Sequence, residues 1–185
     1  MTMTIPTLTA LAAASLLSAC AMSGGMSMSG SAQTGVPDAV RVPAGHSVVL
    51  ETLGTGEITY ECRARKDMAG AFEWAFAGPD ARLMDRSGKA VGRYYGPPAT
   101  WESNDGSRIT GTQLAIAPGG EGNIPLQLVK ANPAMGMGAM QGVSHVQRLA
   151  TRGGVAPAMA CAAGNAGQKS VVKYQADYIF WRAAS

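Results

Sequence analysis

His145 is the residue of this chain best suited to acid–base chemistry, and it lies in the run S-H-V-Q-R (144–148). The other histidine, His46, follows Ala-Gly in a predicted turn and is expected to be exposed. A histidine acts as a general base when a nucleophile or a carboxylate lies within hydrogen-bond reach. Glu102 and Asp105, three residues apart, could complete such a site. This combination predicts a hydrolase as one alternative function.

A structural role for these residues competes with the catalytic one. Neighbouring residues of a strand point to opposite faces, so Ser144 is not expected to share a face with His145. Gln147 and Arg148 offer polar partners, and Asp105 is accounted for by an Asp-Gly turn. We therefore expect His145 to be structural.

The aromatic residues Tyr94, Tyr95 and Trp101 could form a flat ligand-binding patch, with His145 as a polar neighbour. With the adjacent Glu102, Trp101 could also serve glycoside hydrolysis, which uses paired carboxylates. The competing interpretation is that these aromatics pack in the core of a β-structure.

Methionine is unusually frequent, with 11 residues, and Met135, Met137 and Met140 cluster in one Gly-rich segment. Thioethers are soft ligands that select Cu(I), so this spacing predicts copper binding as a further alternative. Methionine in such a loop also serves as an adaptable apolar filler. No cofactor is predicted with the preferred function.

Cys20 follows an apolar stretch of about ten residues, too short to span a membrane but typical of a signal-peptide core. The tetrad L-S-A-C (17–20) resembles the lipobox of bacterial lipoproteins. That resemblance implies that residues 1–19 are removed as a signal peptide and that Cys20 carries fatty-acyl chains such as palmitate. It also implies an exported protein anchored by its lipid to the bacterial envelope, and Ala21 resembles the signal for delivery to the outer membrane.

Cys62 and Cys161 remain as an even pair once Cys20 is lipidated. An oxidising compartment favours a disulfide between them. This disulfide would close a loop of roughly 100 residues. For such a loop the chain-entropy model gives a stabilisation of the folded state by about 4–5 kcal/mol.

The charge balance is mild, with 15 Lys and Arg, 12 Asp and Glu and a net charge of +3. Nucleic-acid binders usually carry a basic stripe, and here the bases are scattered, so no nucleic-acid partner is expected. The predicted partners are the membrane, through the N-terminal lipid, and an unidentified protein or small-molecule ligand.

The sequence divides into three parts. Residues 20–36 comprise the lipidated cysteine and a Gly/Ser/Met tether without charge or periodicity. Residues 37–185 remain for one domain with a real core.

That domain shows strand patterns rather than helical ones. Apolar and polar residues alternate strictly in E-I-T-Y-E-C (57–62) and in F-E-W-A-F (72–76). Turn residues at 85–88 and 104–106 separate further strands, and the longest predicted strand runs from Val171 to Trp181. The pattern predicts an all-β fold, a single antiparallel sandwich or barrel-like domain.

Seven motifs in order resemble the domain-of-unknown-function 3455 family of exported bacterial and fungal proteins. They are V-P-A-G (42–45), G-E-I-T-Y-E-C (56–62), W-x-F-A-G-P (74–79), L-M-D-R-S-G-K-A-V-G (83–92), T-W-E-S-N-D-G-S (100–107), V-S-H-V-Q-R-L-A-T-R-G-G-V-A-P (143–157) and K-Y-Q-A-D-Y-I-F-W (173–181). The resemblance implies a secreted β-rich domain with a cysteine pair like Cys62 and Cys161, and it carries no catalytic residues. The sequence therefore favours a lipid-anchored, non-enzymatic binding or interaction module.

Overall fold

The computed structural model describes Met1 and residues 33–184. Residues 2–32 and 185 lie outside the described residues, and with them Cys20 and most of the predicted tether. Among the residues described, no helix is long and apolar enough to cross a membrane.

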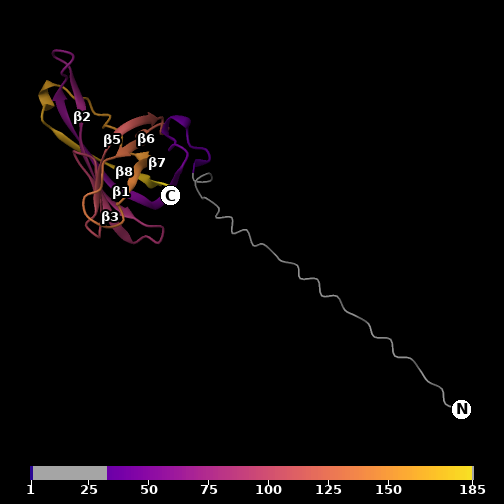
Figure 1. Ribbon diagram of the computed structural model, residues 1–185. Coiled ribbons are helices and arrows are strands. Elements are labelled where there is room, and N and C mark those ends of the chain that lie inside the picture. The colour runs from indigo at the N-terminus through magenta and orange to yellow at the C-terminus, as the bar shows by residue number, and fades with distance from the viewer. Residues whose placement is uncertain (2–32, 185) are drawn as a thin grey trace.

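Eight antiparallel strands follow one another around a closed barrel, in which each strand pairs with the next and β8 returns to β1 (Figure 1). They are β1 (His46–Ala64), β2 (Phe72–Met84), β3 (Ala90–Tyr95), β4 (Thr100–Ser103), β5 (Arg108–Ala117), β6 (Leu126–Ala131), β7 (Val143–Gly153) and β8 (Lys169–Ala183). Among the described residues, the short 3-10 turns η2 (Asp38–Val40) and η3 (Ala163–Asn165) accompany them. The predicted all-β, antiparallel, barrel-like domain is confirmed.

The barrel interior is filled by alternate residues of the strands. In β8 the alternating residues Tyr174, Ala176, Tyr178 and Phe180 are all buried in this core, as their spacing predicts. The Tyr174 and Tyr178 hydroxyls lie 3.1 Å apart, and burial raises the pKa of both phenols. The interior is thus a packed aromatic core.

A second, smaller core lies on the outside of the barrel. Trp181 faces outward from β8, and the segment from Val36 to Val42 covers it. Gln147 joins the two, because its side-chain oxygen accepts a hydrogen bond from Trp181 Nε1 at 2.8 Å and its amide nitrogen donates to Val40 O at 2.7 Å. This contact attaches the start of the described chain to the barrel.

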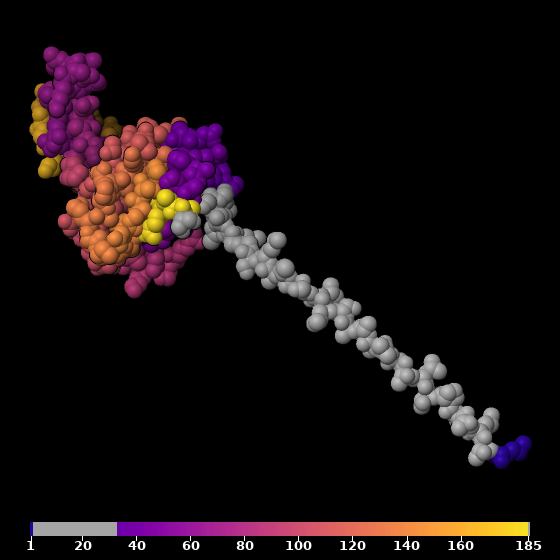
Figure 2. All heavy atoms as spheres, in the orientation of Figure 1, coloured from indigo at the N-terminus to yellow at the C-terminus, as the bar shows by residue number. Residues whose placement is uncertain are grey.

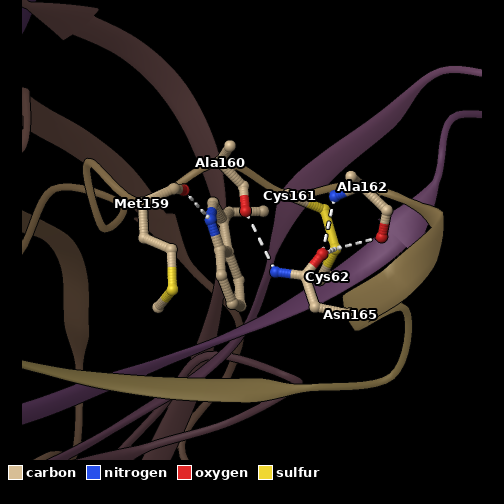
Figure 3. The surroundings of a disulfide bond; sticks show 7 residues. Cys62, Met159, Ala160, Cys161, Ala162 and Asn165 are labelled. Carbon is tan, nitrogen blue, oxygen red and sulfur yellow. Dashed lines mark hydrogen bonds between the residues drawn. A yellow bond between two sulfur atoms is a disulfide. The ribbon is translucent and has the colours of Figure 1, made fainter.

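Strands β1, β2 and β8 continue beyond the barrel as an arm, which comprises residues 59–78 and 155–172 (Figures 1 and 2). Strand β3 pairs only with the part of β2 from Asp80 to Met84, so the rest of β2 pairs with β1 alone. The predicted disulfide is confirmed within this arm, where Cys62 and Cys161 have a Cα–Cα distance of 5.4 Å (Figure 3).

Gly56 allows β1 and β2 to approach closely where the arm leaves the barrel. A Cβ atom at this position would overlap the Asp80 carbonyl oxygen and the Ala81 backbone. We expect Gly56→Ala to lower the free energy of unfolding by about 1–3 kcal/mol, because one of two paired strands must shift. Urea denaturation measures this change.

Gly164→Ala is the matched control, since a Cβ atom at Gly164 would meet nothing within 4 Å. An equal loss of stability in both variants would contradict the close strand approach at Gly56.

Candidate functional site

A groove of about 820 Å³ crosses the outer face of the barrel over β7, β8, β1 and β2. Its floor includes backbone of Gly56, Ala81 and Tyr174. The side chains of Ala81 and Tyr174 are buried in the barrel, so the residues that alternate with them point outward.

The strand register arranges the outward side chains of the groove in two parallel rows. The first row, here called the arginine row, runs Arg82, Thr55, Gln175 and Arg152, and the second, the acid row, runs Asp80, Glu57 and Lys173. The pleat of four neighbouring strands thus places seven polar side chains on one surface.

The charges of the groove are not neutralised by one another at contact distance. Within the described residues, no carboxylate oxygen lies within 4.0 Å of the nitrogen atoms of Arg82, Arg152 or Lys173. Gln175 donates a hydrogen bond to Thr55 Oγ1 at 3.3 Å. The cations of the groove are therefore available to a bound anion.

Asp177 lies one step further along β8, outside the groove. Burial raises the pKa of its carboxyl, and the positive charges of Arg152 and Arg86 act in the opposite direction. Arg152, which lines the groove, therefore also interacts with the charge of this carboxyl.

The lining of the groove carries side chains that are suited to binding a polar, charged ligand. Guanidinium groups hold carboxylates or phosphates through paired N–H donors, and carboxylates accept hydrogen bonds from hydroxyl or ammonium groups. The residues that line the groove include neither histidine nor cysteine.

The three aromatic residues of the predicted ligand patch lie on different faces. Tyr94 and Trp101 stack inside the barrel with ring centroids 4.7 Å apart, and both are buried. Tyr95 lies on the outside, where its hydroxyl donates to Glu102 at 2.7 Å and the Arg93 guanidinium lies over its ring. Tyr94 and Trp101 are thus core residues, as the competing interpretation expected.

His145 lies in β7, but its contacts differ from those that the sequence predicted. A register shift between Val143 and His145 brings Ser144 Oγ to 3.1 Å from His145 Nδ1, although strand neighbours normally point apart. The His46 ring meets His145 edge-on, with centroids 4.8 Å apart, and His46 is half-buried rather than exposed. Burial first, then the charges of His46 and Lys130, lower the pKa of His145.

The polar neighbours expected for His145 bind elsewhere. Gln147 bonds to Trp181 and Val40, and Arg148 donates to the Pro125 carbonyl oxygen. The Ser144 hydroxyl also contacts the Trp181 carbonyl oxygen, at 3.2 Å.

Neither acid proposed for a hydrolase is shown in contact with His145. Glu102 accepts hydrogen bonds from Tyr95 and Arg93, and the Tyr95 bond is the main cause of its lowered pKa. In the part of the chain that the structure describes, no acidic group contacts His145 in a hydrogen bond or an ion pair. These geometries do not assemble a base with an orienting acid.

The three clustered methionines are also separated by the fold. Met140 is fully buried in the barrel core, whereas Met137 is 75% exposed. Met135 is exposed, and its main chain pairs with Arg108. Among the described residues, no group of three or more His, Cys, Asp or Glu side chains could hold a metal ion.

Sequence reasoning missed the groove, although its signal was present. The alternation at 57–62 placed Glu57 on the polar face of its strand. The alternation did not show the strand order, which places Arg152 of β7 and Arg82 of β2 in the same row.

A family model for DUF3455, described as a protein of unknown function, matches residues 43–182. The chain belongs to the DUF3455 family. The match covers all eight strands except the last residue of β8, so the groove and the disulfide both lie within the DUF3455 domain. Comparison with curated proteins and with solved structures found no match.

Asp105 holds two loops together at one end of the barrel. It accepts hydrogen bonds from Ser107 Oγ, Ser107 N and Ala139 N, and these bonds lower the pKa of its carboxyl from 3.8 to about 2. Ser107 Oγ in turn accepts the bond of Met140 N, the residue whose side chain fills the core.

We expect Asp105→Asn to lower the melting temperature at pH 7. A carboxyl whose pKa is lowered on folding stabilises the folded state at pH values above its pKa in the unfolded chain. For Asp105 that stabilisation is lost as the pH falls from 3.8 toward 2. The difference between wild type and variant should therefore shrink over this range. Asp38→Asn is the control, because the side chain of Asp38 is 90% exposed and its ion pair with Arg41 lies in solvent, where such pairs contribute little. A difference that does not depend on pH would refute this role of the carboxylate.

Proposed function

We propose that this DUF3455 protein is a lipid-anchored protein of the bacterial envelope whose barrel is a non-enzymatic binding module. The groove over β7, β8, β1 and β2 is its ligand site. The observation that carries the proposal is the set of three cations, Arg82, Arg152 and Lys173, that face this groove without a carboxylate at ion-pair distance in the described chain.

The spacing of the cations favours an extended ligand. Arg82 and Arg152 lie at the two ends of the arginine row, three strand spacings apart. Neighbouring strands lie about 4.8 Å apart, so the two Cα atoms are separated by roughly 14 Å. One small anion cannot bridge this distance in the plane of the sheet, whereas a chain with several acidic groups can contact both ends.

The centre of the groove favours hydroxyl groups on the same ligand. Thr55 and Gln175 offer both donors and acceptors, and Glu57 and Asp80 accept hydrogen bonds beside them. An oligosaccharide with carboxylated sugars combines the two chemistries, since its carboxylates suit the arginines and its hydroxyls suit the centre. The ligand class we propose is therefore an acidic oligosaccharide.

The proposed anchor rests on the L-S-A-C tetrad that ends at Cys20 and on the uncharged tether that follows it. Residues 33–36, the last of the segment predicted as a tether, belong to the folded part of the chain. Gln33 Nε2 donates a hydrogen bond to Val42 O at 3.0 Å, and Val36 is buried in the second core.

We expect Cys20→Ser to move the protein from the membrane fraction to the soluble fraction of the cells in which it is expressed. Only the thiol can carry the lipid that holds the chain at the membrane. Mass spectrometry of the mature wild-type N-terminus should show acylated Cys20, and Ala21→Ser serves as the control. An unmodified Cys20 in membrane-extracted protein would refute the anchor.

We expect Arg82→Gln with Arg152→Gln to weaken binding of oligogalacturonate by tenfold or more. The substitutions keep a polar N–H donor but remove the two charges at the ends of the row, and isothermal titration calorimetry measures the loss. The wild-type affinity should also fall as salt is added.

Arg108→Gln is the matched control, because Arg108 is an exposed arginine of β5 outside the groove. A neutral oligosaccharide of the same length should bind the wild type and the double variant equally weakly. If oligogalacturonate fails to bind the wild type, or if Arg108→Gln weakens it equally, the groove is not an acidic-oligosaccharide site.

A further inference from the structure

The arm has an open strand edge. Strand β3 pairs with β2 from Asp80 to Met84, and among the described residues no strand pairs with the outer side of β2 from Phe72 to Gly78. Gly78 packs so closely against the Gly96 carbonyl oxygen that the open stretch ends there. Figure 2 shows the arm projecting from the barrel.

The main-chain pattern shows which groups face this opening. Cys62, the partner of Trp74, directs both main-chain groups toward β8, since its N–H donates to Gln168 O and its C=O accepts from Gly167 N. Trp74 is therefore in a non-hydrogen-bonded pair with Cys62, and its own N–H and C=O point away from β1. Phe72 and Phe76, paired with Ala64 and Tyr60, follow the same alternation.

The side chains beside this edge are apolar. Phe72, Trp74 and Phe76 share the face of the arm that carries the disulfide, and Phe76 is 54% exposed. Trp74 Nε1 donates to the Met159 carbonyl oxygen at 2.7 Å, next to the Cys62–Cys161 bond (Figure 3). Met159 is itself 52% exposed. The disulfide thus holds the loop with Met159 against the apolar face of β2. The free edge of β2 borders that face.

Natural proteins usually protect an open edge with lysine, proline, a short strand or inward-pointing charge. From Phe72 to Gly78 the only charged residue is Glu73, and there is no proline. The stretch has the composition of a strand that pairs with another strand.

We propose that the edge of β2 pairs with the same edge of a second copy of this chain, which forms a symmetric dimer with a continuous six-stranded sheet across the two arms. A two-fold axis at Trp74 places Trp74 opposite its own copy and Phe72 opposite Phe76. These are the residues whose main-chain groups point outward, so their hydrogen bonds are satisfied reciprocally.

The charges of the edge favour this register. With the axis at Trp74, Glu73 lies opposite Ala75 of the second copy, so the two glutamates are not directly opposed. The two-fold axis is perpendicular to the sheet, which leaves the apolar faces of both arms on the same side. The two Phe76 side chains then extend one common apolar surface beside the paired edges.

Analytical ultracentrifugation of the full chain in mild detergent tests this proposal over a range of protein concentrations. We expect a monomer–dimer equilibrium in wild type and at least tenfold weaker association in Phe76→Lys, which places a charge beside Phe72 of the second copy. Leu114→Lys is the matched control, because Leu114 is 53% exposed on β5, away from the arm. Phe76→Ala serves as a milder variant if Phe76→Lys does not fold.

Amide hydrogen exchange distinguishes edge pairing from nonspecific apolar contact. The amides of Trp74 and Phe76 should exchange quickly in dilute protein and become at least tenfold slower at concentrations that favour the dimer. A chain that stays monomeric at every concentration, or a dimer whose Trp74 and Phe76 amides remain unprotected, would overturn the proposal. Equal weakening by Leu114→Lys would also overturn it.

Discussion

The pairing of β8 with β1 is the interaction on which the rest of the structure depends. The two strands lie near opposite ends of the domain and pair from His46 with Ala183 to Glu61 with Lys169. Their ladder converts a meander with two open edges into a closed ring, which removes those edges from the barrel body. It also encloses Tyr94, Trp101 and Tyr178 in a buried aromatic core.

The same closure creates the outer groove. Strand β8 pairs with β7 on one side and with β1 on the other, and β1 also pairs with β2. Outward side chains from distant parts of the sequence therefore align in rows. The rows contain like-charged neighbours, such as Glu57 opposite Asp80, which are unfavourable across paired strands. Lys173, which lies opposite Glu57 on its other side, offsets part of this repulsion. Hydroxyl groups of the ligand that we propose would donate hydrogen bonds to the two carboxylates.

Unequal strand lengths produce the arm. Because β1, β2 and β8 are longer than their neighbours, they leave the barrel together, and their interior face loses the opposite wall of the core. The loop that carries Cys161 covers part of that face, and the disulfide holds it there. A covalent bond therefore stabilises the arm, whereas side-chain packing stabilises the barrel.

The amino-acid sequence by itself determined the local features of this protein. Strict alternation predicted the strands around Ile58 and Tyr178, Asp-Gly marked the turn at Asp105, and the even cysteine count predicted the Cys62–Cys161 bond, because these signals depend on neighbours in the chain or on composition. The motifs also predicted the family.

Tertiary structure decided whatever depends on strand order and on the side of the sheet. Neighbouring residues of a strand point to opposite faces, but only the closed barrel decides that Tyr94 lies in the core and Tyr95 lies outside, beside Glu102. The sequence could not show that a register shift brings Ser144 against His145, since a bulge reflects the pairing of two strands rather than the composition of one. Arg82 and Arg152 lie 70 positions apart in the chain and meet in one groove only because the ring closes through β1 and β8.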